Sequence, residues 1–323
     1  MGVSIFSPAK INLYLAVTGR RADGYHDLVS LVAQLDFGDE LEAEVRGQRT
    51  ADGPQFSLEC NDPAVPVDES NLVLKAARAY AAATGWPARP APTFAKASAG
   101  RQGRPDRVHF KLTKRIPPGA GLGGGSSNAV ATLRALNQLA GGRLAEARLA
   151  EVATSLGSDC ALFLSRAPAV MRGRGERIER LAAESVRRLA GRRVLLFKPG
   201  FAISTAWAYG RMASASDQAT KDRGPVYLPE AEAEKRLGAW QQGGAPAEEI
   251  LFNNMEGVAF EKFVALPVLL GRLREEFGLM PRMSGSGSAC LALLGDDFVT
   301  APLIGRIRQC WGPAAFVQEA RIL

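Results

Sequence analysis

A glycine-rich run constrains this chain more than any other feature of its sequence. Residues 117–128 read PPGAGLGGGSSN, which places five glycines in seven positions. The run follows an alternating apolar stretch at 108–112 and precedes a helical pattern of apolar residues at 126–140. Glycine lets a backbone adopt positive φ and approach a ligand closely, and the free N–H groups of a helix's first turn attract anions. The run therefore predicts a loop that binds polyphosphate at the start of a helix.

Two other phosphate loops are excluded by the surrounding sequence. Gly119, Gly121 and Gly124 satisfy GxGxxG, but a dinucleotide fold needs a continuously apolar strand before the glycines. Here the strand alternates and ends at Pro117-Pro118. A Walker A loop ends in GK[ST], and no lysine follows these glycines. A plain flexible linker is disfavoured because serines suited to helix capping and an amphipathic helix follow at once.

Composition narrows the class of protein and of partner. A chain of 323 residues with 46% hydrophobic side chains is long enough for two domains. Its start lacks the pattern of a signal peptide or a myristoylation site, and its apolar stretches are shorter than the roughly 20 residues of a membrane span. Four scattered cysteines without a CxxC pair predict reduced thiols and a cytoplasmic protein. The net charge of +7 suits an anionic partner, and because the arginines are dispersed we expect a phosphorylated small molecule, with no nucleic acid and no membrane.

Periodicity predicts the main elements. Strands are expected at 3–18 and, as a strand pair, at 36–46, where Leu41, Ala43 and Val45 share a face. A helix is expected at 71–84, followed by a terminating Gly85. A strand at 194–197 is expected to follow the start of a second domain near residue 190. Two stretches rich in small and polar residues, 86–106 and 214–244, are expected to be surface insertions, the second partly ordered.

Three motifs resemble those of the GHMP kinases. The run at 117–128 resembles the family's PxxxGLGSSAA loop, SPAKINL at 7–13 its N-terminal motif, and MSGSGSAC at 283–290 its C-terminal glycine motif. The resemblance implies an α+β fold with an N-terminal ribosomal S5-like domain (1–189) and a C-terminal ferredoxin-like domain (190–323). It also implies ATP with Mg²⁺ along the loop, held by Pro117, Pro118, Gly119, Ala120, Gly121, Leu122, Gly123, Gly124, Gly125, Ser126 and Ser127.

Within that family the chain is similar to the diphosphocytidyl-methylerythritol kinases. The similarity rests on PAKINLYL at 8–15, GRRADGYH at 19–26 and GSDCALFL at 157–164, where Cys160-Ala161 replaces the usual valine-proline. It implies transfer of phosphate to the 2-hydroxyl of an acceptor that carries a cytidine diphosphate group. The expected roles are catalytic for Lys10 and Asp159 and substrate-binding for Asn12, Tyr25, His26 and Tyr209.

The chemistry of these residues agrees with those roles. Phosphoryl transfer needs a cation on the moving phosphate and a carboxylate that accepts the hydroxyl proton, which Lys10 and Asp159 can supply. A cytosine offers a face for stacking and an edge for hydrogen bonding, which Tyr25 and His26 can engage. The sequence assigns no Mg²⁺ ligands and no role to His109, and it allows a monomer or a homodimer.

The same residues also allow other interpretations. Asp159 also fits a helix N-cap, Lys10 a solvated strand residue, and Tyr25-His26 an ordinary packed pair. The rival functions are another GHMP kinase, of the homoserine or mevalonate type, and a nucleotide- or RNA-binding protein without catalysis.

Overall fold

The computed structural model describes residues 2–46, 55–85, 107–217 and 226–323. The chain divides into two compact units. The first comprises Met1–Ser7, Gly38–Arg115 and Gly124–Leu164, and the second comprises Pro8–Phe37, Ile116–Gly123 and Ser165–Leu323. Both are discontinuous in sequence because strands β1 (Gly2–Arg20) and β2 (His26–Val45) run from one unit into the other. The predicted domains 1–189 and 190–323 stay a prediction, and the predicted insertion at 86–106 lies outside the described residues.

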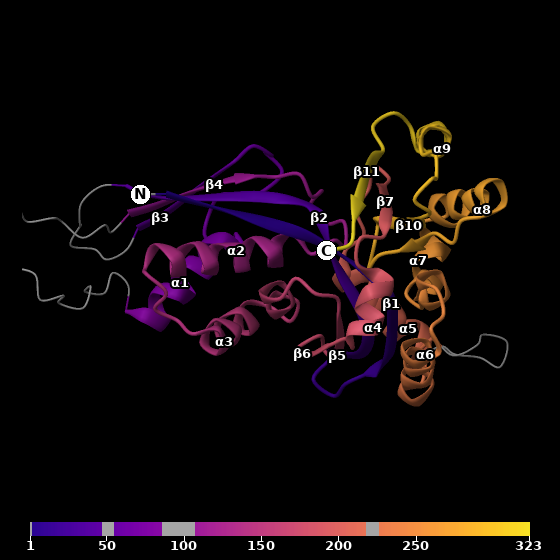
Figure 1. The fold of residues 1–323 in the computed structure, drawn as a ribbon, viewed down its shortest axis with the longest axis horizontal. Coiled ribbons are helices and arrows are strands. Elements are labelled where there is room, and N and C mark those ends of the chain that lie inside the picture. The colour runs from indigo at the N-terminus through magenta and orange to yellow at the C-terminus, as the bar shows by residue number, and fades with distance from the viewer. Residues whose placement is uncertain (1, 47–54, 86–106, 218–225) are drawn as a thin grey trace, which may run out of the picture. The chain divides into compact units, whose positions relative to one another are not determined.

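The first unit packs three helices on one side of its strands (Figure 1). Strand β4 (Arg107–Thr113) pairs antiparallel with the second half of β2 and parallel with β3 (Gln55–Cys60). The helices are α1 (Leu72–Thr84), α2 (Gly124–Leu139) and α3 (Glu146–Leu156), and a 3₁₀ turn, η1 (Cys160–Leu164), follows. The expected alternation of β4 is confirmed, because Val108, Phe110 and Leu112 are buried.

Helix α1 shows how local sequence sets its limits. The Asn71 side chain accepts a hydrogen bond from Val73 N at 2.9 Å, as an N-cap residue does. Gly85 then adopts a left-handed φ of 62° and donates its N–H to Ala81 O. Both predicted ends of this helix are confirmed.

The second unit contains an antiparallel sheet in the order β11-β7-β10-β9. Its strands are β7 (Arg193–Lys198), β9 (Arg282–Met283), β10 (Cys290–Leu294) and β11 (Phe316–Arg321). The first half of β2 pairs with β5 (Ala169–Gly173), which pairs with β6 (Arg177–Arg180), while β1 pairs with β8 (Phe252–Asn253). The remaining elements are α4 (Ala183–Leu189), α5 (Thr205–Asp217), α6 (Glu230–Gly243), η2 (Ala247–Ile250), α7 (Glu256–Lys262), α8 (Ala265–Phe277) and α9 (Ala301–Trp311).

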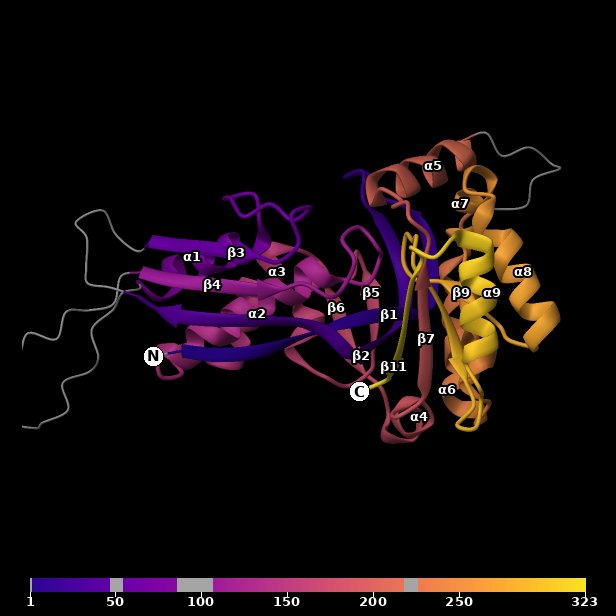
Figure 2. The same cartoon turned by 90° about the horizontal axis from the view of Figure 1, so that it is seen from above.

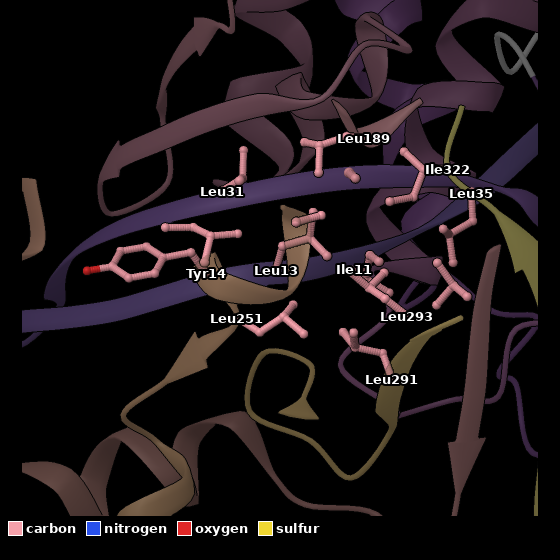
Figure 3. Packing of buried hydrophobic residues seen from close by; sticks show 14 of the residues in the cluster. Ile11, Leu13, Tyr14, Leu31, Leu35, Leu189, Leu251, Leu291, Leu293 and Ile322 are labelled. Atoms are coloured by element: carbon pink, nitrogen blue, oxygen red, sulfur yellow. The ribbon is translucent and has the colours of Figure 1, made fainter. Parts of the chain in front are cut away.

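The sheet of the second unit separates two hydrophobic cores. Side chains alternate along a strand, so Val194 and Leu196 of β7 face one core and Leu195 and Phe197 face the other. The first core joins β10 to the inward residues of β1 and β2, as Figure 3 shows for Ile11, Leu13, Leu31, Leu291 and Leu293. The second core lies under α5, α7, α8 and α9, and Figure 2 shows α8 and α9 along that face. The middle of β1 is therefore buried between these two cores.

One sequence prediction needs correction. The strand pair expected at 36–46 is instead the second half of the single strand β2. The first half of β2 pairs with β5 and the second half with β4. The shared face is confirmed for Leu41 and Ala43, which are buried. The described parts of 214–244 are largely helical, because α6 buries Ala233, Leu237 and Trp240 at helical spacing.

In the described ranges no helix combines the length and apolar character needed to cross a bilayer.

Candidate functional site

Lys10 and Asn12 are neighbours on one face of β1. Only 6% of Lys10 and 7% of Asn12 are exposed, and Lys10 Nζ donates a hydrogen bond of 2.6 Å to Asn12 Oδ1. Asn12 Nδ2 donates to Ser30 Oγ at 2.8 Å, and Ser30 Oγ donates to Tyr14 O at 2.6 Å. These bonds set the orientation of the amide, and the amide in turn orients the lysine amine.

The first part of the glycine loop is held against β1 and the C-terminal glycine motif. Lys10 N donates to Leu122 O at 2.9 Å, and Ala289 N donates to Ala120 O at 3.1 Å. Gly121 has φ +79°, and a Cβ there would lie 2.5 Å from Ser284 O. Only glycine fits this approach, so the loop residue is required for packing as well as for conformation.

Gly285 brings the C-terminal motif to the Lys10 amine. A Cβ at Gly285 would lie 3.4 Å from Lys10 Nζ, 3.3 Å from Asn12 Oδ1 and 3.3 Å from Gly121 O. The structure therefore places residues of all three sequence motifs around one amine. Such a cation beside glycine backbone has the character of a phosphate site.

Two residues that the sequence did not identify hold the C-terminal motif in place. Asn253 Nδ2 donates to Met283 O at 2.8 Å and to Gly285 O at 2.9 Å, and its Oδ1 accepts from Met255 N. Glu256 Oε1 accepts from Met283 N at 2.8 Å, and burial raises the pKa of Glu256. No local pattern in the sequence marked them.

The second part of the glycine loop begins α2. The first turn of α2 carries no acidic side chain, and its Gly125 is exposed while Ser126 is half-buried. Burial raises the pKa of Cys160 to about 11, with the Asp159 charge acting the same way and a hydrogen bond with Ser126 opposing them. Ser126 and Asp159 therefore both lie close to the Cys160 thiol. The helix start can receive an anion, with a carboxylate nearby.

Asp159 immediately precedes η1 and is half-buried. It forms no ion pair with another of the described residues. Its position before a 3₁₀ turn agrees with the capping interpretation as well as with the catalytic one. Its role as a base stays a prediction.

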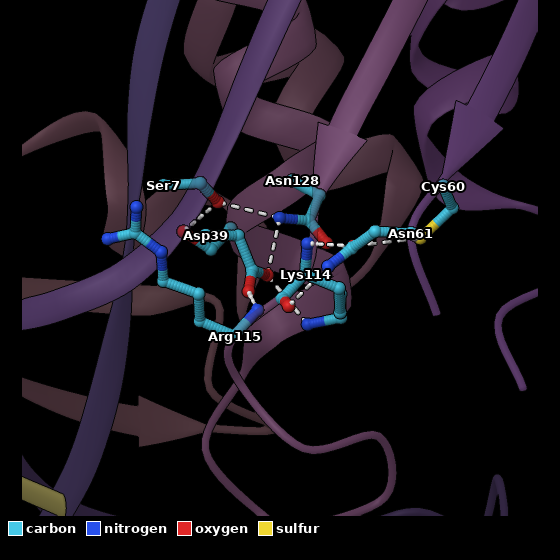
Figure 4. A network of polar contacts seen from close by, with 8 residues as sticks. Ser7, Asp39, Cys60, Asn61, Lys114, Arg115 and Asn128 are labelled. Carbon is cyan, nitrogen blue, oxygen red and sulfur yellow. Dashed lines mark hydrogen bonds and ion pairs between the residues drawn. The ribbon is translucent and has the colours of Figure 1, made fainter. Parts of the chain in front are cut away.

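A buried polar network contacts the first turns of α2, through Ser127 and Asn128 (Figure 4). Asp39, which is fully buried, accepts from Lys114 Nζ at 2.6 Å and from Asn128 Nδ2 at 2.9 Å. Asn128 Nδ2 also donates to Ser7 Oγ, and Ser7 Oγ donates to Ser127 Oγ, both at 2.8 Å. Because the Ser127 oxygen is the acceptor here, its own proton remains available for another partner.

The residues predicted to bind the base differ in exposure: His26 is buried and Tyr25 is exposed. His26 is 7% exposed and packs against Tyr209, with ring centroids 4.9 Å apart. Tyr25 is 56% exposed, and the Arg174 guanidinium lies 4.8 Å from its ring centroid. The structure thus brings His26 together with Tyr209 and leaves one face of Tyr25 covered by an arginine. It adds Tyr227, which the sequence did not identify, 3.0 Å from His26 Nε2 through its hydroxyl.

Comparison with known proteins identifies the family. The GHMP kinases N terminal domain matches residues 71–166. A 4-diphosphocytidyl-2-C-methyl-D-erythritol kinase of Methylacidiphilum infernorum is 33% identical over 324 residues, covering 99% of this chain and 97% of that protein. The protein of the same name from Protochlamydia amoebophila is 35% identical, covering 89% of this chain and 83% of its own length.

Solved structures agree with this assignment. A crystal structure of 4-(cytidine 5'-diphospho)-2C-methyl-D-erythritol kinase matches with a TM-score of 0.70 and 32% identity, covering 99% of both chains. The Methanococcus jannaschii mevalonate kinase matches with a TM-score of 0.68 at 12% identity, which shows a shared fold alone. The α+β GHMP kinase fold expected from the sequence is confirmed. This chain belongs to the 4-diphosphocytidyl-2-C-methyl-D-erythritol kinase family of the GHMP kinases.

Proposed function

We propose that this chain transfers the γ-phosphate of ATP to the 2-hydroxyl of 4-diphosphocytidyl-2-C-methyl-D-erythritol, a step of isoprenoid precursor biosynthesis. One observation carries the proposal: the Lys10 amine lies close to Gly285, and the position of a Cβ at Gly285 also adjoins Gly121 O. The chain that holds this arrangement is similar over 99% of its length to a 4-diphosphocytidyl-2-C-methyl-D-erythritol kinase. A cation held against two glycine segments suits a phosphate group under transfer.

The reaction divides between a cation and a base. The acceptor hydroxyl oxygen forms a new bond to the γ-phosphorus, the bond between that phosphorus and the ADP oxygen breaks, and ADP leaves. Asp159 takes the hydroxyl proton, and Lys10 stabilises charge on the transferred group. Asn12 keeps the amine in place through the 2.6 Å hydrogen bond.

ATP fits the glycine loop that runs from Pro117 to Ser127. The loop leads into the first turn of α2, which has no acidic side chain to repel a polyphosphate. The Ser127 hydroxyl accepts a hydrogen bond from Ser7 and keeps its own proton to donate. Mg²⁺ accompanies ATP in the proposal and neutralises phosphate charge. Magnesium is commonly held by one or two carboxylates together with phosphate oxygens and water.

The cytidine group is proposed to lie at His26, with Tyr25 and Tyr209 as aromatic partners. What supports this is the pairing of a buried imidazole with a tyrosine ring at 4.9 Å, next to an exposed tyrosine. The cytoplasmic location and the monomer or homodimer stay predictions.

A coupled ADP-release assay tests the function. The acceptors are 4-diphosphocytidyl-2-C-methyl-D-erythritol, 2-C-methyl-D-erythritol 4-phosphate, homoserine and mevalonate. We expect turnover with the first alone, because only it offers a base to the site at His26. Preferred use of homoserine or mevalonate would assign another GHMP activity. ATP or RNA binding without ADP release on any acceptor would support the non-catalytic alternative.

A further inference from the structure

The side chain of Asn253 uses both of its amide protons on one segment of the chain. Asn253 ends the short strand β8, where it pairs with Leu15 of β1, and only 4% of it is exposed. Its Nδ2 donates to Met283 O at 2.8 Å and to Gly285 O at 2.9 Å, and its Oδ1 accepts from Met255 N at 3.0 Å. A buried amide with both donors engaged has one defined orientation. Residues 283–285 are therefore held by a single buried side chain.

Ser284 lies between the two carbonyl groups that Asn253 holds. Ser284 is fully buried, its N–H donates to Ala289 O at 2.9 Å, and its Oγ accepts from Asn12 N at 3.2 Å. Asn12 is also the residue whose side-chain oxygen accepts the 2.6 Å hydrogen bond from Lys10 Nζ. One buried serine therefore connects the segment held by Asn253 to the residue that orients the Lys10 amine.

The space around the amine leaves little room for residues 283–285 to shift. A Cβ at Gly285 would lie 3.4 Å from Lys10 Nζ and 3.3 Å from both Asn12 Oδ1 and Gly121 O. These are contact distances, so a displacement of the segment by about 1 Å would push the amine aside or open a gap beside it. The position of the amine thus depends on the position of the segment.

We propose that Asn253 is a positioning residue for phosphoryl transfer, which holds the carbonyl groups on both sides of Ser284 and so keeps Gly285 beside the Lys10 amine. Asn253 acts through the backbone of the segment and touches no substrate. This inference rests on the proposed function, since it assumes that Lys10 acts on the transferred phosphate. Its loss is therefore expected to lower turnover more than ATP affinity.

Asn253→Asp in the whole protein removes the two donated bonds and keeps the size of the side chain. The carboxylate can still accept from Met255 N, but it has no proton to donate to Met283 O or Gly285 O. In the ADP-release assay we expect kcat to fall by about 10²-fold, as for a misplaced catalytic group, with the KM for ATP nearly unchanged. A kcat near the wild-type value, or a loss that appears equally in the KM for ATP, would overturn the proposal.

The neighbouring residue Asn254 supplies a matched control. Its Nδ2 also donates to two carbonyl oxygens, Val17 O at 2.9 Å and Val226 O at 3.1 Å, and its Oδ1 also accepts from a backbone N–H, that of Val17, at 2.9 Å. Asn254→Asp therefore removes the same kind of bonds from a different segment. It should retain the wild-type kcat. An equal loss of kcat in the two variants would show that the effect is general destabilisation and would overturn the proposal.

The pH dependence of the Asn253→Asp variant tests the lost donor itself. Burial and the two facing carbonyl oxygens disfavour a charged carboxylate, so its pKa should lie above the usual ~3.9. Protonation returns one donor to the segment. The ratio of variant kcat to wild-type kcat should therefore rise by roughly tenfold, the effect of one regained hydrogen bond, from about pH 8 to about pH 5.5. Circular dichroism checks that both proteins are folded across this range, and a ratio that stays constant or falls would overturn the proposal.

Other charged groups around the segment are common to both proteins. Glu256 at the start of α7 accepts from Met283 N, Arg282 precedes Met283 in β9, and the Lys10 amine lies beside Gly285. Their titration acts on the wild type and on the variant alike. It therefore cancels in the ratio of the two kcat values.

Amide hydrogen exchange measures the hold on the segment without any substrate. Ser284 N–H donates to Ala289 O, and Gly287 N–H donates to Ser284 O, so both should exchange slowly in the wild type. We expect faster exchange at 283–287 in Asn253→Asp and no change there in Asn254→Asp. Unchanged exchange in Asn253→Asp would overturn the proposal.

A second pair of variants covers the case in which an aspartate variant does not fold. Asn253→Ser and Asn254→Ser bring no charge into a buried site, and neither carries a group that titrates in this pH range. The same contrast in kcat and in exchange is expected between them, without recovery at low pH. Equal kcat values for the two serine variants would overturn the positioning role.

The two proposals fail in different ways. If the wild type uses an acceptor other than the cytidylylated one, the proposed function is wrong, and the kcat ratio measured on that acceptor still tests Asn253. If the wild type uses the cytidylylated acceptor and Asn253→Asp keeps its kcat, only the positioning role is wrong. If no acceptor supports ADP release, both are wrong.

Discussion

The amine of Lys10 donates a 2.6 Å hydrogen bond to the side-chain oxygen of Asn12, two residues further along the same buried strand. Side chains two apart lie on one face of a strand, so the amide is placed to hold the amine. The backbone N–H of Lys10 also donates to Leu122 O, and Gly285 approaches the amine closely. The amine is therefore oriented before any ligand binds.

Lys10→Ala should lower turnover by an amount equal to about 3 kcal/mol of transition-state stabilisation, because the cation acts on charge that develops during transfer. The KM for ATP should change much less. Steady-state kinetics with ATP and the acceptor varied in turn measure both quantities. Equal losses in turnover and ATP affinity would make Lys10 a plain binding residue.

Asp159→Asn should reduce turnover by roughly 10²–10⁴, the usual contribution of a positioned general base, while folding and ATP binding persist. Circular dichroism checks that the variant folds, and nucleotide titration checks that it binds ATP. Asp297→Asn, at an exposed carboxylate between β10 and α9, is the control and should retain full turnover. Turnover near the wild-type value would remove Asp159 from the mechanism and favour its capping role.

Gly121→Ala should lower kcat/KM for ATP by ~10²-fold, because its Cβ would lie 2.5 Å from Ser284 O and one of the two loops must move. Gly141→Ala is a matched control. Gly141 also has positive φ, +75°, but no atom lies within 4 Å of its Cβ position. Gly141→Ala should lower the free energy of unfolding by about 1 kcal/mol and leave ATP kinetics unchanged. Similar kinetics for both variants would show that the Gly121 contact is not required.

Tyr25→Ala should cost about 1–3 kcal/mol in recognition of the acceptor, by analogy with base–aromatic stacking, and leave the KM for ATP nearly unchanged. The base would use the ring face opposite Arg174, whose guanidinium lies 4.8 Å from the ring centroid. Comparing wild type and variant on acceptors with and without cytidine isolates this contact. If the variant's penalty is the same on both acceptors, Tyr25 does not contact the base.

Asp39→Ala should lower the free energy of unfolding by about 3–5 kcal/mol, because it leaves the buried Lys114 amine without its carboxylate. Denaturant titration measures the change. Glu69→Ala removes the exposed carboxylate that pairs with Arg78 and should leave the denaturation midpoint nearly unchanged. Similar midpoints for the two variants would show that the buried network contributes no more than a surface pair.

The sequence by itself determined the features that depend on neighbouring residues. Asn71 and Gly85 mark the ends of α1, and the glycine run marks a loop that enters α2, since caps and positive φ are local properties. The order of three short motifs was sufficient for the kinase family. Strand alternation also predicted the buried face of Leu41 and Ala43.

Tertiary structure alone decided which distant residues meet. Gly121 and Ser284 are 163 residues apart, and His26 and Tyr227 are 201 residues apart. Asn253 and Glu256 carry no motif, yet they hold the loop at 283–285. Such contacts arise when β1, β8 and the sheet of β7 and β10 pack around shared cores, and no local periodicity encodes the register of that packing. The residues proposed to carry the chemistry could therefore be named from the sequence, whereas those that hold them in place became visible only in the fold.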